Sequence, residues 1–141
     1  EVPYKAVYPS VLLGEGDEIW LDDIRFETMI LPGHTPGSAA FKIDFKNNTG
    51  HRTDENKDTA AKYMDAENTI YQVGDSNEPD NIKGIIFTGD TMLAGGHGKT
   101  SLPGGNEDDM MKSLQRLKDI DGNYLIYPGH KEITTLKKER Q

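Results

Sequence analysis

The sequence has 141 residues and a mass of 15.7 kDa, which is the size of one ordinary domain. Its net charge of −8 and pI near 4.9 argue against nucleic acid or a membrane surface as partner, because both carry negative charge that would repel the chain. It contains no cysteine, which excludes disulfides and thiolate metal sites, so any metal must be held by His, Asp or Glu.

Two features bear on where the protein resides and how much of it is present. No apolar run is long enough to span a bilayer, and the N-terminus lacks the basic and apolar regions of a signal peptide, so we expect a cytoplasmic protein. The chain opens at Glu1, without an initiator Met, in strand-like sequence. We therefore expect it to be a piece of a longer protein.

The first third of the chain is expected to form three strands. The segments EIWL (18–21) and IRFETMI (24–30) read as a hairpin joined at Asp22–Asp23, and AAFKIDF (39–45) alternates like a third, half-buried strand. On the second strand, the side chains expected to share one face are Ile24, Phe26, Thr28 and Ile30. On the third, they are Ala39, Phe41, Ile43 and Phe45, with Lys42 and Asp44 on the other face.

The middle of the chain is mostly polar. Residues 46–68 lack sustained periodicity and are expected to be a mobile surface insertion, in which His51 is a solvated loop residue. TIYQV (69–73) and GIIF (84–87) follow as two more strands joined by a turn-rich segment. We expect residues 1–141 to form a single domain that carries this insertion.

One helix is well marked, in the segment 106–122. Asn106 is a suitable N-cap, acidic residues fill the first turn, and Gly122 is suited to end the helix. The buried stripe is expected to consist of Met110, Leu114 and Leu117, with Met111 and Ile120 alongside. YLIY (124–127) is a last short strand that runs into Pro-Gly-His.

Three strand ends each deliver one metal-capable side chain on a glycine-containing turn. They are His34 in PGHT, Asp90 in TGDT and His130 in PGHK. Taken singly, each turn has an ordinary structural reading. Together they suggest a metal site, because imidazole and carboxylate are the ligands available without thiolates, and a carboxylate has two oxygens with which to bridge two ions.

Three segments carry a family resemblance. PGHTPGS (32–38), FTGDTMLAGGHGKTSLPGG (87–105) and YPGHKEITTLKKER (127–140) resemble, in order and spacing, the C-terminal half of the metallo-β-lactamase superfamily, and most closely glyoxalase II-like hydrolases. The resemblance implies an α/β fold, half of an αββα sandwich with a mixed sheet and at least one covering helix. It covers nearly the whole chain outside the 46–68 insertion.

The resemblance also implies a reaction and its residues. A metal-bound hydroxide would attack a thioester or ester carbonyl at a site with two zinc ions, or iron or manganese. His34 would bind the first metal, Asp90 would bridge both and serve catalysis, and His130 would bind the second. Lys99 matches a basic position near the substrate and would pair with a substrate carboxylate. Thr35 and Thr91 are candidates for orienting these ligands.

The departures from the family pattern leave alternatives open. The upstream HxHxDH signature is absent, so we expect the chain to be inactive alone and the complete domain to be the enzyme. Many relatives carry arginine in place of Lys99 and an acidic residue in place of Ser101, which leaves the substrate open. The appended helical domain of glutathione-using glyoxalase II enzymes is not found in the sequence, so we expect a shorter thioesterase-like relative.

Three other functions are alternatives to this hydrolase. A persulfide dioxygenase with a single iron shares the fold. A non-catalytic half-domain would bury its open sheet face against another copy or the missing N-terminal half. A nucleotide-binding module, suggested by GGHGKT, is disfavoured because Leu93 stands where a P-loop needs glycine and because Pro103 follows Lys99 closely.

Overall fold

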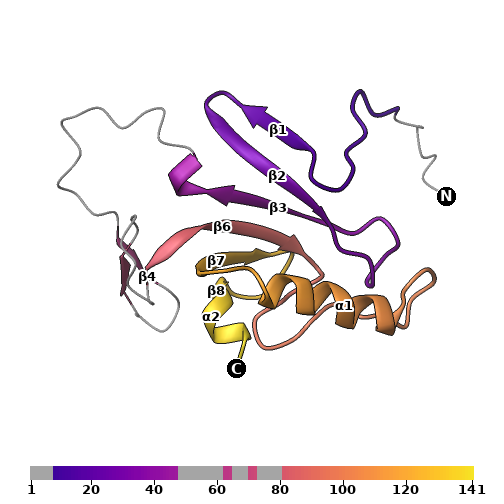
Figure 1. The fold of residues 1–141 in the computed structure, drawn as a ribbon. Coiled ribbons are helices and arrows are strands. Elements are labelled where there is room, and N and C mark those ends of the chain that lie inside the picture. The colour runs from indigo at the N-terminus through magenta and orange to yellow at the C-terminus, as the bar shows by residue number, and fades with distance from the viewer. Residues whose placement is uncertain (1–7, 48–61, 65–69, 73–80) are drawn as a thin grey trace.

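The computed structural model describes residues 8–47, 62–64, 70–72 and 81–141. Six strands form one sheet in the order β1-β2-β3-β6-β7-β8 (Figure 1). They are β1 Glu18–Leu21, β2 Ile24–Ile30, β3 Ala39–Asp44, β6 Ile82–Gly89, β7 Asn123–Pro128 and β8 Thr134–Thr135. The pair β6–β7 is parallel and the other pairs are antiparallel, so the sheet is mixed, as predicted.

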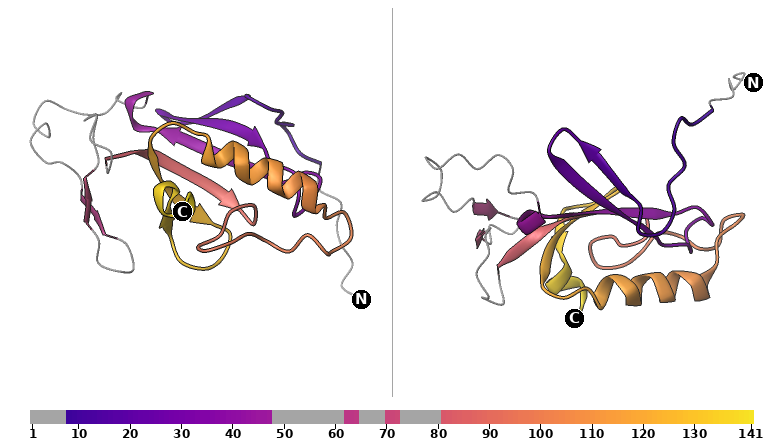
Figure 2. Two further views of the ribbon diagram at one scale, coloured as in Figure 1. Left: turned by 60° about the horizontal axis from the view of Figure 1, so that its bottom comes forward. Right: turned by 45° about the horizontal axis from the view of Figure 1, so that its top comes forward.

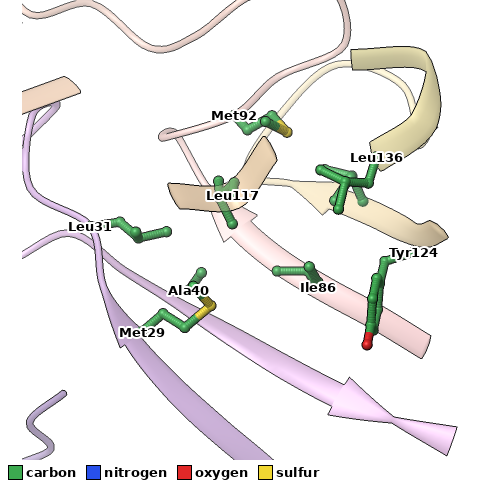
Figure 3. Close-up of a cluster of buried hydrophobic side chains, with 9 residues drawn as sticks. Met29, Leu31, Ala40, Ile86, Met92, Leu117, Tyr124 and Leu136 are labelled. Carbon is green, nitrogen blue, oxygen red and sulfur yellow. The ribbon is translucent and has the colours of Figure 1, made fainter. Parts of the chain in front are cut away.

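Two helices, α1 (Glu107–Lys118) and α2 (Leu136–Glu139), lie on the same face of this sheet (Figure 2). Between them and the sheet lies a cluster of buried apolar side chains (Figure 3). Its members are Met29, Leu31, Ala40, Ile86, Met92, Leu117, Tyr124, Ile126 and Leu136. The helix α1 connects β6 to its parallel neighbour β7, as parallel strands require a crossover.

The helix α1 begins as predicted and ends earlier. The Asn106 side chain accepts a hydrogen bond from the Asp109 amide at 3.0 Å, which confirms the N-cap. The helix ends at Lys118 rather than at Gly122, whose φ of 91° belongs to the turn that follows. The expectation that Met111 is buried is wrong, since it is 43% exposed, and Ser113 is buried in the stripe instead.

The core beneath the helices lies on one face of the sheet. The apolar side chains of β2 and β3 that were expected to share a face lie on the other. Thr28, Phe41, Phe87 and Tyr127 are register partners across four strands and therefore share one face. The core residues Met29, Ala40 and Ile86 alternate with them on the other face. On that helix-covered face Lys42 pairs with Glu27 at 2.9 Å, while Asp44 accepts a hydrogen bond from Tyr124 at 3.3 Å.

The face without helices is called the open face below and contains Leu21, Ile24, Phe26, Phe41, Phe87 and Tyr127. Leu21 is 64% exposed, Ile24 42% and Phe87 38%. The rings of Phe87 and Tyr127 contact each other with centroids 5.5 Å apart. A sheet with apolar side chains on both faces is typical of a layered fold in which both faces are covered.

The polar segment 46–68 contains regular structure that its composition does not suggest. Lys62–Met64 forms the strand β4, which pairs antiparallel with β5 (Ile70–Gln72). Most of the predicted insertion, together with His51, lies outside the described residues. Among the residues that the structure describes, no helix is long and apolar enough to cross a membrane.

The start of the described chain is held to β2 and α1 by Glu15. Its carboxylate accepts a hydrogen bond from the Ile30 amide at 2.7 Å and pairs with the Arg116 guanidinium, which also donates to the Ile30 carbonyl at 2.8 Å. Partial burial raises the pKa of Glu15, but the Ile30 amide and Arg116 outweigh this effect and lower it.

This depressed pKa predicts a pH dependence of stability. A carboxylate with a lowered folded pKa stabilises the fold above its unfolded pKa, and this contribution is lost as the pH falls through the folded value. The difference in unfolding free energy between the wild type and Glu15→Gln should therefore shrink below about pH 4.5. Urea unfolding at a series of pH values measures it, with Glu132→Gln at an exposed position as control. A difference that is constant with pH would contradict the prediction.

Candidate metal centre

Three strands that run in the same direction bring the predicted residues to one edge of the sheet. β2 and β6 both pair antiparallel with β3, and β7 is parallel to β6, so all three end at the same edge. His34 follows β2 by a short turn, Asp90 comes directly after β6, and His130 follows β7. In the structure Asp90 lies next to both histidines.

Asp90 lies between the two histidines. Its Oδ1 is 3.0 Å from His130 Nδ1, and its Oδ2 is 3.6 Å from His34 Nε2. The side chains of His34, Asp90 and His130 are 23%, 30% and 55% exposed. Each oxygen of one carboxylate thus faces a different imidazole, at a position that solvent or a ligand can reach.

The tautomer of His34 follows from a backbone contact. His34 Nδ1 lies 2.7 Å from the Lys99 carbonyl oxygen. A carbonyl oxygen only accepts, so Nδ1 carries the hydrogen, and in the neutral imidazole Nε2 is left as a lone-pair donor atom. This Nε2 and Asp90 Oδ2 then face each other as two electron-rich atoms, an arrangement that a cation between them would stabilise.

The donor set fits a metal of the zinc class. Two zinc bonds of about 2.1 Å meeting at a roughly tetrahedral angle span about 3.4 Å, close to the 3.6 Å between His34 Nε2 and Asp90 Oδ2. Nitrogen and carboxylate oxygen suit zinc, iron and manganese alike. Within the described ranges, however, no three His, Asp or Glu side chains converge closely enough to hold a metal ion by themselves.

Two glycines make room for the carboxylate. A methyl group at Gly129 would lie 2.4 Å from Asp90 Oδ1, and one at Gly98 would lie 2.3 Å from the Asp90 carbonyl oxygen and 3.1 Å from His34 Nδ1. The Gly129 amide donates to the Gly89 carbonyl at 2.8 Å, and the Gly98 amide donates to the Asp90 carbonyl at 2.7 Å. Both positions therefore require close backbone approach, which only glycine permits.

The other predicted residues have different contacts from those expected. Lys99 is exposed and reaches His34 through its backbone carbonyl, a role that no side-chain pattern reveals. The Thr35 hydroxyl bonds to Ser38 at 2.9 Å and contacts none of the three candidate ligands. The buried Thr91 hydroxyl donates to the Leu31 carbonyl at 3.3 Å and thereby joins the ends of β6 and β2.

The structure contradicts the P-loop interpretation of GGHGKT. A P-loop lysine stands at the beginning of a helix, where backbone amides face the phosphates. Here α1 begins only at Glu107, after the turns that follow Lys99.

Curated relatives match most of the chain. An uncharacterized protein, Rv2581c from Mycobacterium tuberculosis, is 30% identical over 128 residues, which is 90% of this chain and 43% of the relative. Hydroxyacylglutathione hydrolase GloC from Haemophilus influenzae is 26% identical, with the same shares covered. Mouse persulfide dioxygenase ETHE1 is 26% identical over 91% of this chain and 38% of its own length. The chain thus spans less than half the length of these relatives.

Solved structures show the same fold. ETHE1 from Myxococcus xanthus matches with a TM-score of 0.60 and 23% identity over 93% of this chain and 43% of that one. TTHA1623, solved in a di-iron-bound form, matches with a TM-score of 0.59 and 26% identity over 97% of this chain and 48% of that one. No protein-family model matches the chain.

These likenesses identify the class of protein. The α/β fold with a mixed sheet is shared with structures described as ETHE1 and as a B3 metallo-β-lactamase. The relatives and the solved structures support a member of the metallo-β-lactamase superfamily, and the chain spans less than half the length of the relatives it matches.

Proposed function

We propose that this chain forms the C-terminal part of a glyoxalase II-like metallo-hydrolase that cleaves a thioester or ester. The placement of Asp90 carries the proposal, since its two oxygens face the imidazoles of His34 and His130. Two metal ions, zinc or else iron or manganese, would be held by His34, Asp90 and His130 together with ligands from the rest of the domain. The relative GloC is named a hydroxyacylglutathione hydrolase, which supports the thioester class.

Bound metal ions would polarise the carbonyl of the substrate and supply a water of lowered pKa. The residues of the chain contribute orientation. The Lys99 carbonyl keeps the proton of His34 on Nδ1 and leaves Nε2 to bind, and Asp90 supplies the negative charge that offsets two cations. The exposed Lys99 ammonium would pair with a substrate carboxylate at the mouth of the site.

The open face fits the same proposal. Its apolar side chains would be covered by the N-terminal half of the domain, which would also bring the upstream ligands. A chain that lacks this half should self-associate through the same face. Sedimentation equilibrium of the wild type and of Phe87→Glu measures this, with a monomer expected for the variant.

A persulfide dioxygenase with one iron is the second candidate, because ETHE1 is as similar to this chain as GloC is. The experiment that separates the two uses this chain and a longer polypeptide that supplies an HxHxDH segment. Metal content is measured by elemental analysis. Thioester hydrolysis is assayed with a hydroxyacylglutathione, and oxygen uptake is assayed with a persulfide. Hydrolysis by the longer polypeptide supports the proposal, whereas oxygen uptake without hydrolysis replaces it with the dioxygenase.

A further inference from the structure

We propose that Glu107 is a positioning residue for the metal centre. It holds the loop 97–100 so that the Lys99 carbonyl keeps the proton of His34 on Nδ1 and leaves Nε2 free to bind a cation. The inference rests on the proposed metal-binding role of His34, because only then does the choice of ring nitrogen matter. Glu107 is not expected to touch a metal or a substrate.

Glu107 contacts the loop on both sides of the carbonyl that His34 uses. One carboxylate oxygen accepts a hydrogen bond from the Thr100 hydroxyl, which directly follows Lys99. The other lies 3.9 Å from His97 Nε2, two residues before Lys99. The carbonyl that receives His34 Nδ1–H at 2.7 Å thus stands between two contacts to a single carboxylate.

The same helical turn is also fixed to the loop that carries His34. The Asn106 amide, next to Glu107, donates to the Gly33 carbonyl at 2.8 Å. Nearly two turns further on, the Ser113 hydroxyl donates to the Pro32 carbonyl at 2.7 Å. The start of α1 therefore holds the backbone before His34 and, through Glu107, the backbone that accepts its proton.

This double attachment has a chemical consequence. In a neutral imidazole the proton resides on the nitrogen whose partner accepts it, and the other nitrogen is then free to bind metal. If the loop 97–100 moves away, the Lys99 carbonyl no longer selects Nδ1–H. A proton on Nε2 would then occupy the position that faces Asp90 Oδ2.

The test compares four variants of the 141-residue chain. Glu107→Ala removes both contacts, Thr100→Val removes one, and Glu107→Gln keeps an acceptor for Thr100. Asp108→Ala removes a neighbouring carboxylate of the same first turn and is the matched control for charge at the helix start. Glu107 is 58% exposed, so the substitutions should leave the fold intact.

Two measurements are made on each variant. Long-range ¹H–¹⁵N NMR spectra of the metal-free chain at about pH 8, above the ordinary histidine pKa, show which nitrogen of His34 is protonated. Zinc affinity is then measured by competition with a chromophoric chelator. We expect Nδ1–H in the wild type, a mixture of tautomers and roughly 10-fold weaker zinc binding in Glu107→Ala and Thr100→Val, and recovery in Glu107→Gln.

The outcomes are decisive in either direction. A wild-type His34 tautomer in Glu107→Ala would overturn the proposal. Equal changes of the tautomer in Glu107→Ala and Asp108→Ala would also overturn it, because they would reflect charge at the helix start alone. The tautomer is measured without metal. A chain that shows the tautomer shift but binds no zinc would therefore count against the proposed function while upholding the role of Glu107.

Discussion

Replacing Asp90 with asparagine is expected to lower the zinc affinity of the longer polypeptide that supplies the HxHxDH segment by at least about 100-fold. This is the upper end of the loss seen when a group that merely supports a ligand is removed. Both oxygens of the carboxylate face imidazoles, at 3.0 Å and 3.6 Å. Asparagine keeps the shape but removes the charge and one of the two acceptor oxygens. The variant should therefore lose most metal affinity without unfolding.

Zinc titration and elemental analysis after desalting measure this effect, and circular dichroism reports on the fold. Asp119→Asn is the matched control, because that carboxylate accepts a hydrogen bond from Gln115 at the end of α1, away from the three candidate ligands. An Asp90→Asn chain that binds zinc as tightly as the wild type would remove Asp90 from the proposed metal centre.

The second large effect is expected for Gly33→Ala, on stability. Gly33 has a φ of 144°, and a methyl group there would lie 2.5 Å from the Met110 Cα in the helix backbone. Backbone strain and overpacking each cost about 1–3 kcal/mol, so we expect a loss of roughly 2–4 kcal/mol in unfolding free energy. Because Gly33 precedes His34, the variant should also weaken zinc binding.

The same loop provides the control. A methyl group at Gly37 would meet nothing within 4 Å, and its φ is not in the positive range. Gly37→Ala should be neutral or stabilising by up to about 1 kcal/mol, since alanine restricts the unfolded chain. Urea denaturation of both variants gives the comparison. Equal stability of the two would show that the fit of Gly33 against α1 contributes little.

Much of the candidate site was predictable because local patterns define it. Alternation marks β2 and β3, short apolar runs mark β6 and β7, and the Pro-Gly-His and Gly-Asp turns follow strand ends directly. Strands that end at the same edge of one sheet then bring His34, Asp90 and His130 together. Convergence needed the strands, which have sequence signals, and their order in the sheet, which local patterns do not specify.

Other features depend on contacts between distant segments and have no local signal. Alternation along β3 shows that two faces differ, but not which one lies under α1, and Ala40 rather than Phe41 is in the core. The polar Ser113 is accommodated on the buried face because its hydroxyl donates to the Pro32 carbonyl of a distant segment, whereas Met111 is exposed. No sequence pattern predicts the Lys99 carbonyl as the partner of His34, since every residue type offers the same backbone group.

The long-range nature of the site also sets an order of events during folding. His34 and Lys99 are 65 residues apart, and Asp90 and His130 are 40 apart. Contacts of such separation form slowly, because the entropy of closing large loops is lost before the contacts stabilise the chain. The parallel pair β6–β7 also has to wait for its crossover through α1. We therefore expect the candidate ligands to meet late in folding, so that metal would bind the finished sheet rather than nucleate it.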